Sequence, residues 1–117
     1  MSAPVVLVSG ATGGIGAAVV RRFANSGWQA AVTDLDQQRL ESLDMSGIVA
    51  RVPGDVRSAE TCRGIVGQVT GITGRLDALV NTAGVWREGP TESCSEADFD
   101  VVVDVNLKGT FFLCAAA

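Results

Sequence analysis

The chain has 117 residues, of which 47% are hydrophobic and 19% charged, and its net charge is −4. This composition excludes an intrinsically disordered chain, and the acidic balance without a lysine or arginine run excludes a nucleic-acid-binding surface. No apolar stretch approaches the ~20 residues of a membrane span, and no basic segment precedes the apolar N-terminal run as in a secretory signal. Three cysteines and no histidine exclude a zinc site and a histidine-based catalytic triad. We therefore expect a cytoplasmic, single-domain protein with reduced thiols that binds no nucleic acid, membrane or metal.

Short apolar segments alternate four times with longer amphipathic segments, which predicts alternating strands and helices. We expect strands at residues 5–8, 29–33, 48–52 and 76–80. We expect helices at residues 14–25, from Asp36 to about residue 45, from Ser58 onward and over residues 96–117. Because the strands are apolar on both faces, they predict a parallel sheet with helices on either side. Right-handed crossovers leave a doubly wound, Rossmann-like α/β fold as the simplest topology.

Apolar side chains recur at helical spacing in the first and last helices. In residues 14–25 the stripe consists of Ile15, Val19 and Phe23, which we expect to face the sheet. In the last helix, six residues are expected on the inward face: Phe99, Val102, Val103, Asn106, Thr110 and Leu113.

The chain stops inside this last apolar helix, with no glycine, cap or polar tail after it. We therefore expect a longer protein, truncated here after the fourth strand and the long helix. The uncovered end of the helix carries Phe111, Phe112 and Leu113, which predicts a homo-oligomer associating through the long helix.

A glycine-rich turn, SGATGGIG, lies between the first strand and the first helix. Gly10 would permit a tight exit from the strand, and Gly14 and Gly16 would let a pyrophosphate and the neighbouring strand approach the backbone. The free N–H groups at the helix start would face the anion. Because glycine turns are common, an ordinary strand–helix turn is the alternative interpretation.

An acid follows the second strand at the position expected for ribose binding. Asp34 comes 18 residues after Gly16, close to the ~20 residues typical of the acid that holds an adenosine ribose. Its carboxylate would accept hydrogen bonds from both ribose hydroxyls and repel a 2′-phosphate. No lysine or arginine lies next to it in sequence, and Thr12 occupies the glycine turn. We therefore predict NAD(H) rather than NADP(H); the alternative is a helix-entry acid, a role that Asp36 could serve instead.

Four segments together resemble the motifs of the short-chain dehydrogenase/reductase family in order and spacing. The glycine turn is similar to T-G-x-x-x-G-I-G, with Ser9 in place of the usual threonine. Residues 54–56 resemble the adenine-recognition segment, residues 81–84 resemble N-N-A-G with Thr82 replacing the second asparagine, and residues 104–110 resemble the V-N-x-x-G segment. The resemblance covers the whole chain but only about the first half of a family member.

The resemblance implies a role for each of these segments. The glycine turn, including Thr12 and Ile15, would hold the cofactor, and Asp55 with Val56 would bind the adenine. Three further residues would lie along the cofactor: Asn81, Ala83 and Gly84. Asn106 would be an active-site asparagine that holds a water in the proton relay, and a satisfied core asparagine is the alternative.

The resemblance also shows what this chain lacks. In the family a tyrosine transfers the hydroxyl proton, a lysine four residues later lowers its pKa, and a serine binds the substrate oxygen, all outside the matching segment. The chain has no tyrosine, and its lysine, Lys108, lies on the long helix. We therefore expect a parent NAD-dependent oxidoreductase that transfers a hydride between nicotinamide and a secondary alcohol or ketone, while this chain alone is inactive. A non-catalytic nucleotide-binding module and an inactive fragment remain alternatives. Trp86 either flanks a substrate pocket or packs on a neighbouring helix.

Overall fold

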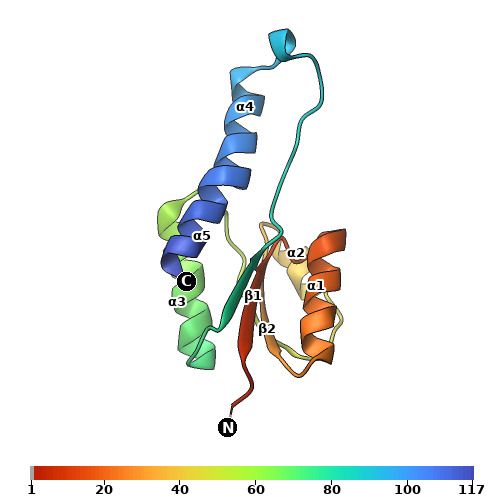
Figure 1. Cartoon of the computed structure of the whole chain (residues 1–117), viewed down its shortest axis with the longest axis vertical. Helices are drawn as coiled ribbons and strands as arrows, with labels where there is room; N and C mark the ends of the chain where they lie inside the picture. The colour runs from red at the N-terminus through yellow and green to blue at the C-terminus, as the bar shows by residue number, and fades with distance from the viewer. Residues whose placement is uncertain (1) are drawn as a thin grey trace.

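The fold is built on a four-stranded parallel sheet in the order β3-β2-β1-β4 (Figure 1). The computed structural model describes residues 2–117. The strands are β1 (Val5–Ser9), β2 (Gln29–Thr33), β3 (Ile48–Arg51) and β4 (Ala78–Asn81). β1 is central, since Val8 pairs with Val32 on one side and Val80 on the other. The predicted doubly wound, Rossmann-like α/β fold is confirmed.

Helices cover both faces of the sheet. On one face lie α1 (Gly14–Asn25) and α2 (Gln37–Glu41), and on the other lie α3 (Ala59–Thr73) and α5 (Thr110–Ala116) (Figure 1). A 3-10 turn, η1 (Thr91–Ser93), precedes α4 (Glu96–Val103), which continues into α5 through a π-helical turn, η2 (Asp104–Gly109). α4 extends beyond the carboxyl ends of the strands, so the molecule is elongated in that direction (Figure 1).

The two faces of the sheet form two hydrophobic cores, because successive strand residues point to opposite sides. On β1, Val5 and Leu7 belong to the core that includes Leu113 of α5. Val6 and Val8 belong to the other core, with side chains of α1 and α2. All four of these β1 side chains are fully buried. This two-sided burial explains the continuous apolar runs in the strands.

Several element ends differ from the prediction. Asp36 caps α2 as expected, but the helix ends at Glu41 rather than near residue 45. Arg51 of β3 donates to the carbonyl oxygens of Leu40 and Leu43, at 3.1 and 2.8 Å. Carbonyl groups at the end of a helix lack partners within the helix, and Arg51 supplies donors to two carbonyls there. The helix can therefore end at Glu41.

The third and fourth strands also shift by one or two residues. β3 ends one residue before the predicted end, and β4 covers residues 78–81 rather than 76–80. Before β4, the side chain of Asp77 accepts a hydrogen bond from the N–H of Val5 at 2.8 Å. The Val5 N–H is thus paired with a side chain and not with the backbone of β4. β4 therefore begins after Asp77, two residues later than predicted.

α1 faces the sheet with a different stripe from the predicted one. Gly16 and Val20 are buried, whereas Ile15 is 76% exposed, so the predicted inward position of Ile15 is wrong. A Cβ at position 16 would collide with the carbonyl oxygen of Gly10. Because only glycine fits there, Gly16 and Val20, one turn later, face the sheet. The other two residues of the predicted stripe, Val19 and Phe23, are partly buried against the core.

The long helix forms over the predicted residues, with the π turn near its middle. Leu113 is buried as expected, but Phe99 is 60% exposed and Asn106 is exposed, so their predicted inward positions are wrong. For Phe99 the physical reason is visible in Figure 1: α4 runs past the sheet and has no strand to pack on. Asn106, in η2, pairs instead with the main chain of Val85. Within residues 2–117, no helix combines the length and the apolarity needed to cross a membrane.

Candidate functional site

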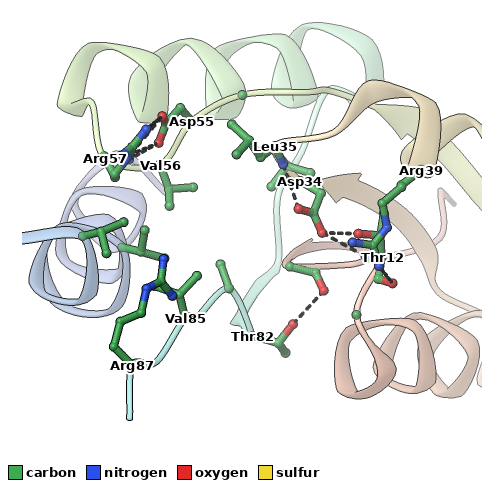
Figure 2. Close-up of a pocket in the computed structure, with 18 residues that line it drawn as sticks. Thr12, Asp34, Leu35, Arg39, Asp55, Val56, Arg57, Thr82, Val85 and Arg87 are labelled. Carbon is green, nitrogen blue, oxygen red and sulfur yellow. Dashed lines mark hydrogen bonds and ion pairs between the residues drawn. The ribbon is translucent and has the colours of Figure 1, made fainter. Parts of the chain in front are cut away.

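A cavity of about 450 Å³ opens at the carboxyl ends of the strands (Figure 2). It lies where the strand order reverses, because the chain runs from β1 outward to β3 and then returns to the other side of β1 as β4. Open α/β sheets bind their ligands at this switch point. The volume falls in the range of small-molecule sites.

Gly10 and Gly16 give the turn after β1 its shape. Gly10 has a φ of +65°, and a Cβ there would lie 2.5 Å from the main-chain nitrogen of Ala83. Gly16 packs on the carbonyl of Gly10, as described above. By contrast, a Cβ on Gly14 would meet no atom within 4 Å. The space at the start of α1 is therefore open, and the first-turn N–H groups of the helix are available to an anion there.

Asp34 is held in place by the glycine turn. Its Oδ2 accepts hydrogen bonds from the hydroxyl of Thr12 at 2.6 Å and from the Thr12 N–H at 3.1 Å (Figure 2). Its Oδ1 accepts from the N–H of Leu35 at 2.7 Å. Oδ1 has a second lone pair, and a ligand hydroxyl could replace the Thr12 hydroxyl at Oδ2. The carboxylate can therefore accept hydrogen bonds from the two hydroxyls of a ligand diol.

An arginine shares the cavity with Asp34 although none is adjacent to it in sequence. Arg39 of α2 lines the same cavity, and its Nη2 donates to the carbonyl oxygen of Thr12 at 3.1 Å (Figure 2). The sequence neighbours of Asp34 are not basic, but the fold brings Arg39 into the same cavity. The first turn of α2 brings the guanidinium back over the glycine turn, a contact that sequence adjacency does not reveal.

Asp55 is surrounded by donors from Arg57. Oδ1 of Asp55 accepts from the Arg57 N–H and Nε, both at 3.0 Å, and Oδ2 accepts from Nη2 at 2.6 Å and from Nε at 3.0 Å. The side-chain hydrogen bonds from Arg57 lower the pKa of Asp55. Since the folded pKa lies below the unfolded value, the stabilisation is present above about pH 3.9 and is lost as the pH falls through the folded pKa. The pair is partly exposed to solvent, so this stabilisation is small.

The turn after β4 is tied to the end of β1. The hydroxyl of Thr82 donates to the carbonyl of Ser9 at 2.6 Å. Ser9 Oγ accepts from the N–H of Ala83 at 3.3 Å and donates to Oδ1 of Asn81 at 3.4 Å. Nδ2 of Asn81 lies 3.5 Å from Sγ of Cys114 on α5. Asn81 therefore links β1, β4 and α5.

Asn106 pairs with the main chain of the loop that follows β4. Its Oδ1 accepts from the N–H of Val85 at 2.8 Å, and its Nδ2 donates to the Val85 carbonyl at 2.7 Å. Both halves of the amide are satisfied, so this side chain fixes the loop. A Cβ on Gly84 would lie 3.3 Å from the same Oδ1, which leaves little room for a larger residue.

Most of the predicted site residues meet at the cavity. Those that line it are Gly10, Thr12, Asp34, Asp55, Val56, Ala83 and Gly84. Those that do not line it are Gly14, Ile15, Gly16, Asn81 and Asn106. Gly14 and Ile15 lie in the first turn of α1, and the side chain of Ile15 is exposed.

Sequence reasoning missed several lining residues. Arg39, Arg57, Arg87, Val101 and Val105 all line the cavity. The four-residue spacing of Val101 and Val105 on one helix face is a signal that could have found them. The neighbour of Arg87, Trp86, is 71% exposed and does not line the cavity.

Replacing Asn106 with alanine is expected to lower the free energy of unfolding by about 1–2 kcal/mol, because two hydrogen bonds to Val85 are lost. Hydrogen exchange at the Val85 amide should accelerate at the same time. Urea unfolding and amide exchange measure the two effects. Asn25→Ala at the exposed end of α1 is the control and should change stability by less than about 0.5 kcal/mol. An Asn106→Ala protein with wild-type stability and exchange would show that the pairing with Val85 does not hold the loop.

A sequence profile of the family described as short chain dehydrogenase matches residues 4–117, nearly the whole chain. The chain belongs to the short-chain dehydrogenase/reductase family. D-threitol dehydrogenase of Mycolicibacterium smegmatis is 38% identical, over 96% of this chain and 45% of that protein. The (2S)-[(R)-hydroxy(phenyl)methyl]succinyl-CoA dehydrogenase subunit BbsD of Thauera aromatica is 38% identical, over 97% of this chain and 47% of that protein.

Solved structures of short-chain dehydrogenases show the same arrangement. A short chain dehydrogenase from Mycobacterium smegmatis superposes with a TM-score of 0.93 at 32% identity, over 99% of this chain and 50% of that one. Actinorhodin polyketide ketoreductase, solved with NADPH, superposes with a TM-score of 0.90 at 32% identity, over 97% of this chain and 46% of that one. The chain thus spans about half the length of the short-chain dehydrogenases that it matches.

The cavity suits the nicotinamide dinucleotides that the short-chain dehydrogenase family binds. Gly10 and Gly13 of the glycine turn line the cavity, and Asp34 and Asp55, which follow β2 and β3, present carboxylates to it. Thr33, also in the wall, has a buried hydroxyl that finds no partner among residues 2–117. In the same part of the chain, no group of three His, Cys, Asp or Glu side chains could hold a metal ion. The donor set therefore fits a nucleotide.

Proposed function

We propose that this chain is the cofactor-binding half of an oxidoreductase that transfers a hydride between NAD(H) and a secondary alcohol or ketone. Membership in the short-chain dehydrogenase/reductase family supports the reaction class. The observation that carries the proposal is the cavity at the switch point, where Asp34 and Asp55 line one space together with the glycine turn.

The proposed binding roles follow from this geometry. The open backbone at Gly14, with the first turn of α1, would hold the pyrophosphate, and Asp34 would accept from the ribose hydroxyls. Asp55 and Val56 would bind the adenine. When bound, the nicotinamide supplies the hydride chemistry. We retain Asn106 as the proposed catalytic residue of this chain, supporting proton transfer beside the cavity while its side chain orients the loop after β4.

Asp34 supports NAD(H) over NADP(H), because a 2′-phosphate would meet its carboxylate. The test is a titration of the chain with NADH and with NADPH, followed by quenching of tryptophan emission from Trp28 and Trp86. We expect saturable binding of both, with NADH the tighter ligand. Equal affinity or tighter NADPH binding would contradict the proposed preference, and no binding of either would contradict the proposed function.

We further propose that the chain alone does not turn over substrate, since it contains no tyrosine to serve as the proton donor of the family. The substrate would be a small alcohol or ketone, with no nucleic-acid or membrane partner. A cytoplasmic location is supported by the thiols: Cys62, Cys94 and Cys114 are all free.

Self-association through the long helix is the proposed oligomeric contact. Phe111 is 62% exposed and Leu107 is 67% exposed, while Leu113 is buried in the core and is not available for contact. Phe111→Ser is therefore expected to shift the chain toward monomer in sedimentation velocity at high concentration. Ile72→Ser, at an equally exposed apolar residue of α3, is the control and should leave the distribution unchanged. A wild-type chain that stays monomeric would contradict this proposal.

A further inference from the structure

Two arginine–aspartate pairs of the same spacing occupy different parts of the molecule. Arg57 pairs with Asp55, and Arg75 pairs with Asp77, each two residues apart and each partly exposed. The second pair lies at the start of β1, where Asp77 also accepts the N–H of Val5. In the first pair, both residues line the cavity. Exposed ion pairs contribute little stability, and the first pair differs from the second in facing the cavity.

We propose that Arg57 is a positioning residue that fixes the carboxylate of Asp55 for recognition of the 6-amino group of an adenine nucleotide. The inference rests on the proposed function, which assigns the adenine to Asp55 and Val56. Arg57 lies outside the four motif segments, and by orienting Asp55 it would contribute to selection of the base.

The backbone around Asp55 is already fixed by packing on its other side. A Cβ on Gly109 of η2 would lie 2.7 Å from Cγ2 of Val56, so the π turn packs closely against this segment. The carbonyl of Asp55 accepts the N–H of Ser58 at 3.3 Å, just before α3 begins. These contacts hold the backbone but not the Asp55 carboxylate. The hydrogen bonds that restrain the rotation of the carboxylate come from Arg57.

Arg57 restrains that group through three different donors. Its N–H holds Oδ1, its Nη2 holds Oδ2 at 2.6 Å, and its Nε lies 3.0 Å from each oxygen. The shared Nε contact is the one that an incoming amino group can replace, since the other two donors still fix one oxygen each. The Asp55 side chain is 34% exposed, which leaves it accessible. A carboxylate held in this way accepts from an N–H donor without first losing rotational freedom.

The test compares reduced dinucleotides that differ at the base. NADH carries an adenine with a 6-amino donor, whereas reduced nicotinamide hypoxanthine dinucleotide carries a 6-oxo acceptor. Calorimetric titration of the chain with both ligands gives the ratio of their affinities. Arg57→Ala is expected to weaken NADH binding by about 3- to 10-fold and to reduce the preference for adenine by a similar factor. Arg57→Lys, which keeps the charge but lacks the fork of donors, should restore only part of the preference.

Arg75→Ala is the matched control, because it removes a pair of the same type away from the cavity. It should leave the ratio between the two bases unchanged even if it lowers the unfolding midpoint. If the wild-type chain binds NADH and Arg57→Ala leaves the ratio of the two affinities unchanged, the inference is overturned but the proposed function is not. Tighter NADH binding by Arg57→Ala would also overturn it, since Arg57 would then compete with the base for Asp55. A wild-type chain that binds neither dinucleotide would overturn the proposed function and this inference together.

Discussion

Replacing Gly10 with alanine is expected to lower the free energy of unfolding by about 2–4 kcal/mol, from left-handed backbone strain and from overpacking. Gly10 has a φ of +65°, and the added Cβ would stand 2.5 Å from the Ala83 nitrogen and 2.7 Å from the Thr82 carbonyl carbon. These neighbours are main-chain atoms, so a side-chain rotation cannot relieve the contact. Urea unfolding measures the change.

Gly14→Ala is the matched control within the same turn. Its Cβ would meet nothing within 4 Å, so stability should change by less than about 1 kcal/mol. Its affinity for NADH should nevertheless fall by at least about tenfold, because the methyl group would occupy the space proposed for the pyrophosphate. Equal stability losses in the two variants would show that the turn is not shaped by the contact between Gly10 and Ala83. Unchanged NADH affinity in Gly14→Ala would place the phosphates elsewhere.

Replacing Asp34 with alanine is expected to weaken NADH binding by about 10- to 100-fold, because the proposed hydrogen bonds from the two ribose hydroxyls are lost. NADPH should lose much less affinity, since its 2′-phosphate no longer meets a carboxylate. With that repulsion gone, the guanidinium of Arg39, which lines the same cavity, could pair with a 2′-phosphate. The gap between the two cofactors should therefore narrow or reverse in parallel titrations.

Asp36→Ala provides the control for Asp34. Asp36 caps α2 by accepting the N–H groups of Gln38 and Arg39, so its loss should lower stability by about 1 kcal/mol. Its effect on the NADH-to-NADPH ratio should be absent. If Asp34→Ala behaved like Asp36→Ala, with a stability loss and an unchanged ratio, Asp34 would be a helix-entry acid and not a ribose ligand.

Local sequence signals identified the elements well and their faces less well. The β-branched run of β1 and the caps at Asp36 and Ser58 are local features, and the structure has a strand and two capped helices there. The face of α1 was predicted wrongly because hydrophobic spacing favours Ile15, whereas Gly16 must meet the carbonyl of Gly10. Close backbone contact between segments, which hydrophobicity does not encode, decided the rotation of this helix.

The candidate site divides in the same way. Motif spacing was enough to predict the gathering of Asp34, Asp55 and the turn after β4, because parallel strands bring their carboxyl ends to one edge. Arg39 and the partner of Asn106 could not be predicted. They depend on contacts across 27 and 21 residues of sequence, respectively.

The sequence by itself determined the family, the doubly wound sheet and the acids at the strand ends. These follow from short-range patterns of glycine, apolar and acidic residues, which can be recognised without knowing how the chain packs. The tertiary structure alone decided which donors surround each acid: Thr12 at Asp34, and the full set of Arg57 donors at Asp55. Side-chain hydrogen bonds depend on distances of a few tenths of an ångström between segments, and only the packed chain fixes those distances.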